Sequence, residues 1–220
     1  MLTGFVILLS CDNKLSCKDI QDQYFSIVED LNTEKDTMTF LEDLNELIET
    51  KSRCLKAYQV RGFFKMLKGN FPSAKKDFLL SIQGDSSVYS YYCLSLLYNW
   101  EAKNDSALYF IEKAMRMKVS GKYVINYNNY FQQTFDVGYG KLVFQRGIIN
   151  YEVGKLRAAK GDFLKSIYHQ YEKGEAYAYV AGVYYRLYNM DSACFYQALA
   201  KANSYDNLVE PNISEKCKDP

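Results

Sequence analysis

One segment of this chain occurs twice, and this internal repeat constrains the fold more than any other feature. When the sequence is shifted by 85 residues, 11 of the 28 positions in Leu55–Ile82 are identical to their counterparts in Gly140–Ile167. Self-similarity of this kind predicts a repeated supersecondary unit that buries its apolar face by stacking against its neighbours. The main identities are Arg61/Arg146, Gly62/Gly147, Gly69/Gly154, Ala74/Ala159, Asp77/Asp162, Phe78/Phe163, Ser81/Ser166 and Ile82/Ile167.

Each copy is predicted to form two helices joined by a tight turn. In the first copy, Gly62 lies where a neighbouring helix must approach closely, and Gly69 suits the left-handed residue that ends a helix. Pro72 opens the second helix, because the N–H that proline lacks has no partner in a first turn. An apolar stripe with the helical period follows, formed by Ala74, Phe78, Ser81 and Ile82.

This order of residues resembles the tetratricopeptide repeat (TPR) family, which spaces small, glycine, alanine and aromatic positions in the same way. The family's aromatic residue midway along the first helix is absent, and Lys65 and Asn150 stand in its place. The matching positions are Gly62, Gly69, Ala74, Phe78 and Ser81 in one copy and Gly147, Gly154, Ala159, Phe163 and Ser166 in the other.

Two weaker copies complete the pattern. Both contain the sequence Asp-Ser-Ala, and we expect Asp105 and Asp191 to cap their second helices by accepting hydrogen bonds from free backbone N–H groups. The anchor alanines of the four units are 33, 52 and 34 residues apart, against a family period of about 34. The positions that match are Ser95, Tyr98, Ala107 and Ala114 in one copy and Ala181, Tyr184, Ala193 and Ala200 in the other.

The resemblance implies an all-α protein, a right-handed α-solenoid of antiparallel helix pairs. Four units occupy residues 55–202, and an insertion near residues 118–140 either lengthens the first helix of the third unit or adds one helix. Residues 18–54 are expected to form a degenerate helical cap, and residues 203–220 a loose polar tail. The cap's apolar stripe consists of Phe40, Leu41, Leu44, Leu47 and Ile48.

The beginning of the chain resembles an export signal. Residues 1–10 contain a short uncharged apolar run, too short to span a bilayer, which fits a cleaved leader. The run Leu8-Leu9-Ser10-Cys11 resembles a bacterial lipobox, which implies a lipid on Cys11 and a polar tether over residues 11–17. The alternative is that residues 1–10 are part of the fold and Cys11 is an ordinary cysteine.

The six cysteines do not indicate whether the protein resides in an oxidising or a reducing compartment. No CxxC pair occurs, so a zinc or thioredoxin-like site has no support. Cys93 and Cys194 fall on helix faces and are expected to be small buried hydrophobic residues. Cys17 and Cys54 are able to form a disulfide in an oxidising compartment, but sequence alone does not decide this.

No catalytic signature is present. His169 is the single histidine, and its place at a helix end favours a capping or solvated role over catalysis. Glycine-rich phosphate-binding motifs are absent, and a net charge of +1 offers no field for nucleic acid. We therefore expect a non-enzymatic protein with no cofactor, no metal ion and no nucleic-acid partner.

A binding surface is therefore the remaining expectation. TPR arrays line a concave groove with the first helix of each unit, and the groove holds a protein or peptide partner. Only Asn99 and Arg186 fit the family's carboxylate clamp, so a clamp is not expected, and the alternative is that the aromatic residues pack neighbouring helices. The positions of this chain that map to the groove are Tyr89, Tyr92, Asn99, Trp100, Phe144, Ile148, Tyr151, Glu152, Tyr185 and Arg186.

These patterns favour a membrane-tethered interaction scaffold of the bacterial cell envelope. Assembly factor and immunity protein are equally open roles within that class. Two alternatives remain: a small-molecule or glycan-binding module that uses its tyrosine and tryptophan rings, and a soluble cytosolic TPR adaptor.

Overall fold

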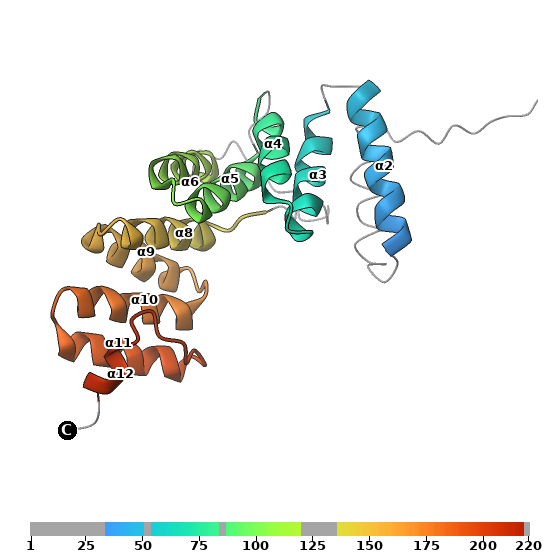
Figure 1. The fold of residues 1–220 in the computed structure, drawn as a ribbon. Coiled ribbons are helices and arrows are strands. Elements are labelled where there is room, and N and C mark those ends of the chain that lie inside the picture. The colour runs from blue at the N-terminus through green and yellow to red at the C-terminus, as the bar shows by residue number, and fades with distance from the viewer. Residues whose placement is uncertain (1–33, 51–53, 84–86, 120–135, 218–220) are drawn as a thin grey trace, which may run out of the picture.

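Helical hairpins form the molecule, and no strand occurs in the residues that the structure describes. The structure is a computed structural model that describes residues 34–50, 54–83, 87–119 and 136–217. Successive hairpins stack side by side in one open array (Figure 1). The hairpins are α3 (Leu55–Leu67) with α4 (Phe71–Ser81), α5 (Val88–Trp100) with α6 (Asn104–Val119), α8 (Tyr139–Glu152) with α9 (Leu156–Tyr168), and α10 (Lys173–Arg186) with α11 (Met190–Ala202). The predicted α-solenoid is confirmed.

The first helix of every hairpin ends in the same turn. Its left-handed residue is Gly69 (φ 74°), Ala102 (φ 55°), Gly154 (φ 76°) or Tyr188 (φ 58°). The following N–H then bonds back to a carbonyl of the last helical turn, as from Asn189 to the Tyr184 oxygen at 2.9 Å. The predicted turn at Gly69 is therefore confirmed, and two of the four units make it without glycine.

Replacing Tyr188 by glycine is expected to raise the free energy of unfolding by about 0.5–1 kcal/mol. A non-glycine residue is strained in the left-handed region, and the 95% exposed Tyr188 side chain loses no packing. Urea denaturation followed by circular dichroism measures the change. The control is Tyr168→Gly, an exposed tyrosine of α9, which should be destabilising; a loss of stability in Tyr188→Gly would contradict the argument.

The first hairpin joins its two helices by a buried ion pair. Asp77 on α4 is 2% exposed and accepts hydrogen bonds from Arg61 Nε at 2.9 Å and Arg61 Nη2 at 2.7 Å. Lys65 Nζ lies 2.8 Å from Asp77 Oδ2, the oxygen that also accepts from Arg61 Nε. Lys65 therefore replaces the family's aromatic residue because its position faces a carboxylate.

The third hairpin repeats this arrangement. Asp162 accepts hydrogen bonds from Arg146 Nε at 3.0 Å and Nη2 at 2.5 Å, and this bonding raises the pKa of Arg146. Asn150 Nδ2 donates to Asp162 at 3.0 Å, in the place that Lys65 takes in the first hairpin. Lys65 and Asn150 thus replace the family's aromatic residue for the same reason, because each position faces an aspartate of the second helix.

The second and fourth hairpins use stacked rings in the same place. Tyr98 stacks on Phe110 with a centroid distance of 5.2 Å, and Tyr184 on Tyr196 at 5.4 Å. Ionic and aromatic hairpins therefore alternate along the array. This alternation explains why the strong self-match spans two units, 85 residues, instead of one.

Lysines of the ionic hairpins join them to the aromatic hairpins that follow. Lys75 of α4 lies 5.0 Å from the Tyr98 ring centroid, and Lys160 of α9 lies 4.9 Å from that of Tyr184. Cation–π contacts of this kind are favourable because the ring face is electronegative. The pair of hairpins is thus the repeating element of packing as well as of sequence.

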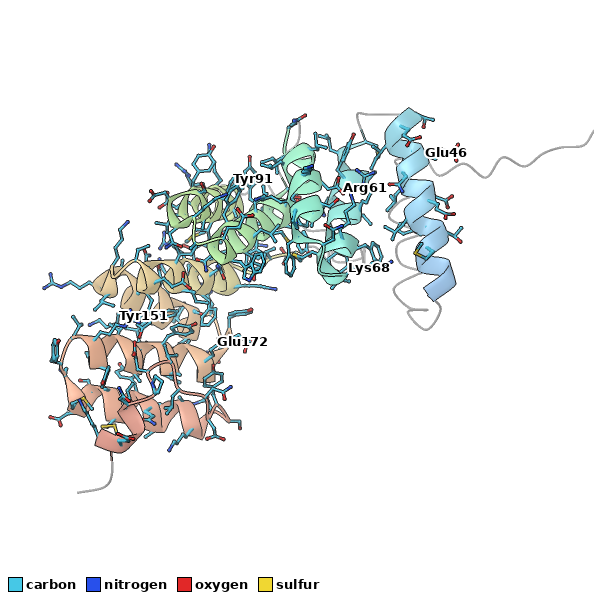
Figure 2. All side chains as sticks on the ribbon, in the orientation of Figure 1. Glu46, Arg61, Lys68, Tyr91, Tyr151 and Glu172 are labelled. Atoms are coloured by element: carbon cyan, nitrogen blue, oxygen red, sulfur yellow. A yellow bond between two sulfur atoms is a disulfide. The ribbon has the colours of Figure 1, made fainter. Side chains whose placement is uncertain are left out.

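The helix α2 (Glu34–Thr50) covers the amino-terminal end of the array. The predicted stripe is buried, with Phe40 at 2%, Leu44 at 0% and Leu47 at 3% exposure. Arg61, on the side of α3 that faces α2 (Figure 2), donates from Nη1 to Asn45 Oδ1 at 2.7 Å. The rest of the predicted cap, the leader, Cys11 and the tether lie outside the described residues.

The insertion does not lengthen the first helix of the third unit. This helix, α8, begins at Tyr139, and residues 136–138 before it are not helical. The other predicted possibility, an added helix, falls on residues 120–135, which lie outside the described residues.

The predicted helix caps are wrong in register. The N-cap of α11 is Asn189, whose side chain accepts from the Ser192 N–H at 3.0 Å, and Asp191 lies inside the first turn. Asp105 is likewise inside the first turn of α6. Both carboxylates still favour these helices, because the amino end of a helix carries partial positive charge.

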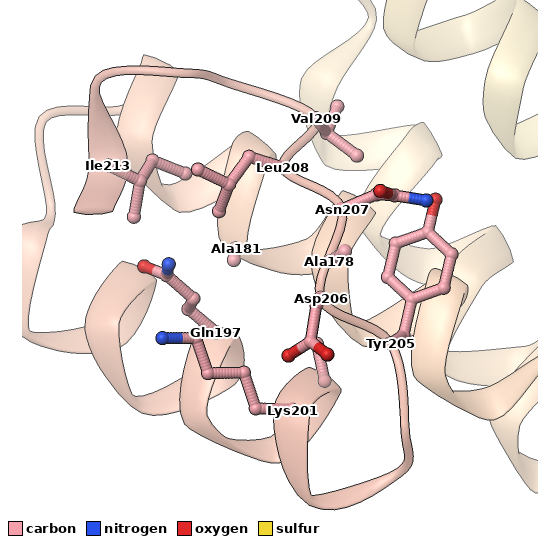
Figure 3. A pocket seen from close by; sticks show the side chains of 11 residues that line it. Ala178, Ala181, Gln197, Lys201, Tyr205, Asp206, Asn207, Leu208, Val209 and Ile213 are labelled. Atoms are coloured by element: carbon pink, nitrogen blue, oxygen red, sulfur yellow. The ribbon is translucent and has the colours of Figure 1, made fainter.

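The carboxyl-terminal tail is not loose over its described part. Tyr205, Leu208, Val209 and Ile213 close a small cavity against α10 and α11, and Ile213 is 1% exposed (Figure 3). The tail ends in α12 (Ile213–Lys216), next to a disulfide between Cys217 and Cys194. Cys194 is therefore not the free buried residue that its helix face predicted. The apolar residues of the tail are scattered among polar ones without a helical or strand period, so the sequence did not predict that the tail packs against α10 and α11.

Of the other described cysteines, Cys93 has a free thiol and Cys54 is in a disulfide. Cys93 is fully buried and free, as predicted, and burial raises the pKa of its thiol to about 12. Cys54 is buried and disulfide-bonded. Cys17, the partner considered for it from sequence, lies outside the described residues.

Replacing Cys217 by serine is expected to lower the free energy of unfolding by about 2 kcal/mol under non-reducing conditions. The disulfide closes a loop with a sequence separation of 23, which restricts the unfolded chain. Urea denaturation measures the loss. The matched control, Cys194→Ser with Cys217→Ser, should match the single variant, and an unchanged unfolding midpoint in both would contradict the prediction.

Candidate functional site

The ten predicted groove residues divide into a buried and an accessible set. Together they form the first-helix surface, built by α5, α8 and α10. Tyr89, Tyr92, Phe144 and Tyr151 are at most 9% exposed and act as packing between hairpins. The six accessible residues are Asn99, Trp100, Ile148, Glu152, Tyr185 and Arg186.

The buried rings of α5 connect it to both neighbouring hairpins. Tyr89 contacts the rings of Phe63 and Phe78, each with a centroid distance of 6.2 Å. Tyr92 lies beneath Lys141 of α8, whose Nζ is 5.0 Å from the ring centroid. Burial raises the pKa of Tyr92, so its hydroxyl stays neutral at physiological pH.

The buried rings of α8 hold α10 in place. Tyr179 of α10 inserts between Phe144 and Tyr151, with ring centroids 5.8 Å and 5.6 Å away, and stacks on Phe163 at 4.7 Å. Burial raises the pKa of Tyr179 to about 12. These rings therefore fix the spacing of the first helices.

The accessible residues lie above this aromatic layer. Asn99 of α5 donates from Nδ2 to Glu152 Oε1 of α8 at 3.4 Å, so the two helices present adjoining polar groups. Trp100 follows Asn99, is 70% exposed and contacts the Phe71 ring edge-on at 5.0 Å. Ile148 packs partly on the second core cluster. Polar and aromatic groups thus meet at the end of α5.

The tail contributes to the far end of the surface. Arg186 lies over the Tyr151 ring at 3.9 Å and donates from Nη1 to the Tyr151 carbonyl at 3.2 Å. Glu210 accepts from Arg186 Nε and from the Tyr151 hydroxyl, both at 2.5 Å. Tyr151 lies between its own hairpin and α10 (Figure 2). Lys216 of α12 covers Tyr185, with Nζ 5.3 Å from the ring centroid.

Two residues of this surface were missed from sequence. Lys141 occupies a first-helix position, and its register in the unit was a usable signal. Glu210 lies in the tail beyond the repeats, where no pattern predicted a contact. The tail therefore restricts access to Tyr151 and Arg186, and leaves Asn99, Trp100 and Glu152 as the accessible end.

Glu175, in the first turn of α10, gives this end of the molecule a pH dependence. Burial, and then the nearby Glu172 carboxylate, raises the pKa of Glu175 above its ordinary value of 4.5. The folded state therefore binds this proton more tightly than the unfolded state, and stability falls as pH rises between the two pKa values. We expect Glu175→Gln to melt at a higher temperature than the native chain at pH 7, with a smaller difference at pH 4.

Thermal melts of both proteins at the two pH values measure this effect. Glu215→Gln, on the exposed face of α12, is the control and should leave the difference between the two pH values unchanged. An equal effect of Glu175→Gln at pH 4 and pH 7 would contradict the assignment.

His169 is the C-cap residue of α9 and is exposed, in keeping with its predicted capping role. Its ring lies between those of Tyr139 and Tyr168, at 5.2 Å and 5.4 Å. Among the described residues, no group of three or more His, Cys, Asp or Glu side chains is placed to hold a metal ion. No described helix is long and apolar enough to cross a membrane.

No protein-family model and no curated protein matches this sequence. Solved structures nevertheless share the fold. Two crystal structures of MamA superpose with TM-scores of 0.66 and 0.64, at 15% and 16% identity. The alignments cover 84% and 88% of this chain and 95% and 100% of those chains. BtubC from P. vanneervenii superposes with a TM-score of 0.54 at 15% identity, over 80% of this chain and 75% of BtubC.

Identity this low shows the fold alone. The stacked hairpins, the repeated turn and the small residues Gly62 and Gly147 beneath aromatic rings define a TPR-like α-solenoid. The resemblance noted from sequence is therefore confirmed at the level of the fold. Folds of this class typically serve as interaction scaffolds, and such a role has to be argued from the site.

Proposed function

We propose that this protein is a non-enzymatic scaffold that binds a segment of a protein partner on its first-helix surface. The observation that carries the proposal is Trp100, a tryptophan left 70% exposed beside the polar pair Asn99 and Glu152. Tryptophan is enriched among the residues that anchor protein interfaces, and here it stands beside groups that are able to form hydrogen bonds with a partner. The stacked helices beneath hold this patch rigid, which lowers the entropy lost on binding.

The partner segment is expected to be extended and polar, with one apolar side chain. Asn99 and Glu152 offer hydrogen-bonding groups to its backbone, and Trp100 and Ile148 offer apolar contact. Glu152 is an acceptor only, so a basic or amide group next to the anchor fits best.

A photo-crosslinking amino acid at position 99 tests the proposal in the native host. We expect a discrete crosslinked partner that is lost in a Trp100→Ala background. The control carries the crosslinker at Tyr109, an exposed residue of the second helix α6, and should not give the same product. The same product from both positions, or none from position 99, would refute the proposal.

We also propose that the scaffold belongs to the bacterial envelope, tethered through a lipid on Cys11. The disulfide between Cys194 and Cys217 supports an oxidising compartment, because cytosolic disulfides are rare. Intact mass and membrane partition in the native host test the tether. Loss of residues 1–10 with acyl chains on Cys11 is expected, whereas an unprocessed soluble chain would favour the cytosolic adaptor.

The exposed tryptophan also suits the glycan-binding alternative, since sugar rings stack on indole faces. Trp100 is the single tryptophan of the chain, so its fluorescence reports this site without interference. A glycan panel that leaves the Trp100 emission unchanged would exclude this alternative and retain the protein scaffold.

A further inference from the structure

A second candidate site lies between the second helices α6 and α9, on neither of the surfaces described above. An open cleft of about 740 Å³ is bordered there by Glu112 on α6 and by Arg157, Gly161 and Lys165 on α9. Its floor is formed by the polar residues Arg146 and Asn150 of α8. The cleft is much larger than the tail cavity and large enough for several residues of a peptide.

The floor presents a donor and an acceptor that the fold does not use. Arg146 binds Asp162 through Nε and Nη2, and Asn150 binds it through Nδ2. Among the described residues, no hydrogen bond is made by Arg146 Nη1 or by Asn150 Oδ1. Asn150 is only 6% exposed, both side chains are held by Asp162, and their positions four residues apart place them on the same face of α8. One residue of an extended chain offers the complementary pair, because its own carbonyl and N–H point to the same side.

The first hairpin shows what such a position binds. There the equivalent Arg61 uses its Nη1 to take the side-chain amide oxygen of Asn45 on α2, at 2.7 Å. In the third hairpin the preceding helix is α6, which presents Glu112 beside an open cleft instead of an amide. Arg61 Nη1 therefore has an acceptor from the same chain, whereas the equivalent Arg146 Nη1 is left to bond a partner.

Gly161 indicates that the cleft is kept open at a cost in stability. It lies inside α9, it does not have a positive φ, and a Cβ added to it would meet nothing within 4 Å. Neither backbone conformation nor packing requires glycine here, and glycine destabilises a helix interior relative to alanine. The equivalent positions of the other three hairpins carry large side chains, which are Lys76, Tyr109 and Phe195.

The charge of the cleft selects among peptides. Arg157 and Lys165 stand on the α9 side, whereas Glu112 is the acidic residue of the rim. The Asp162 carboxylate is already taken up by Arg146 and Asn150. The cleft thus has an excess of positive charge and attracts carboxylate side chains.

We infer that this cleft binds an extended, acidic segment of a protein partner. The carbonyl and the N–H of one extended residue of the segment bond to Arg146 Nη1 and Asn150 Oδ1, and a carboxylate side chain pairs with Arg157 or Lys165. Gly161 leaves room for the backbone to lie against α9. The inference does not depend on the first-helix surface, and together the two sites would let one scaffold hold two segments.

Fluorescence anisotropy with a short labelled peptide of alternating glycine and glutamate tests the inference on the full chain at low salt. We expect saturable binding that Gly161→Leu weakens by at least about tenfold, because the leucine side chain occupies the space on α9 against which the backbone of the segment lies. Phe195→Leu is the matched control, at the same position of the fourth hairpin, and should change the affinity by less than about twofold. Thermal melts establish that both variants are folded.

Charge reversal separates this site from general attraction. Arg157→Glu should abolish binding, whereas Lys201→Glu, with the same change in net charge on α11, should retain it. Trp100→Ala should leave the affinity unchanged, which distinguishes this cleft from the proposed function. Equal binding by Gly161→Leu and the native chain, equal losses from both charge reversals, or no binding by the native chain would overturn the inference.

Discussion

Replacing Phe163 by alanine is expected to lower the free energy of unfolding by about 3–5 kcal/mol. Phe163 is fully buried, stacks on Tyr179 at 4.7 Å and meets Phe144 edge-on at 5.6 Å. Its ring also fills the space over Gly147, where an added Cβ would lie 2.8 Å from it. Because α8, α9 and α10 all contact this ring, its removal leaves a cavity that no single helix is able to close.

Urea denaturation by circular dichroism and by Trp100 fluorescence measures this loss. Phe195→Ala on α11 is the control, because that ring is 60% exposed and should contribute less than about 1 kcal/mol. Stability is shared between neighbouring units in a repeat array, so the third and fourth hairpins should unfold before the first. Similar losses in the two variants would show that Phe163 does not hold the hairpins together.

Replacing Asp77 by alanine is expected to lower the free energy of unfolding by about 3–5 kcal/mol. The 2% exposed carboxylate neutralises Arg61 and Lys65, and its loss leaves two half-buried cations facing each other. The cost comes mainly from these stranded charges, because a buried ion pair itself adds little over well-packed apolar residues.

This reasoning gives a second, opposite expectation for a triple variant. Arg61→Leu, Lys65→Tyr and Asp77→Phe reproduce the residues of the second hairpin, which are Leu94, Tyr98 and Phe110. We expect this variant to regain most of the stability that Asp77→Ala loses, measured by the same urea titration. A triple variant as unstable as the single one would show that the two kinds of hairpin are not interchangeable.

The fold could be predicted from sequence because its determinants are local and periodic. Gly69 and Pro72 mark a turn and a helix start within a few residues, and Gly62 and Phe78 recur with their spacing at Gly147 and Phe163. The replacement of the family's aromatic residue by Lys65 was visible too. Its cause was not, because the Asp77 partner lies on the other helix of the hairpin.

The candidate site was less accessible to sequence reasoning. The repeat register located the first-helix surface, but the burial of Phe144 and Tyr151 depends on Tyr179, which comes from the next unit. The contacts of the carboxyl-terminal tail could not be predicted from sequence for a different reason. Glu210 and Cys217 lie beyond the last repeat, so neither helical period nor family spacing constrains where they pack.

Because ionic and aromatic hairpins alternate, such a chain is expected to gain or lose hairpins two at a time. Loss of the second or the third hairpin alone would place two of the same kind in contact, a junction found nowhere in the described array. Loss of the second and third together would bring an ionic hairpin against an aromatic one, as Lys75 on Tyr98 and Lys160 on Tyr184 already do. Duplication or deletion by pairs of hairpins therefore preserves every junction, so the pair is the natural unit of growth for this scaffold.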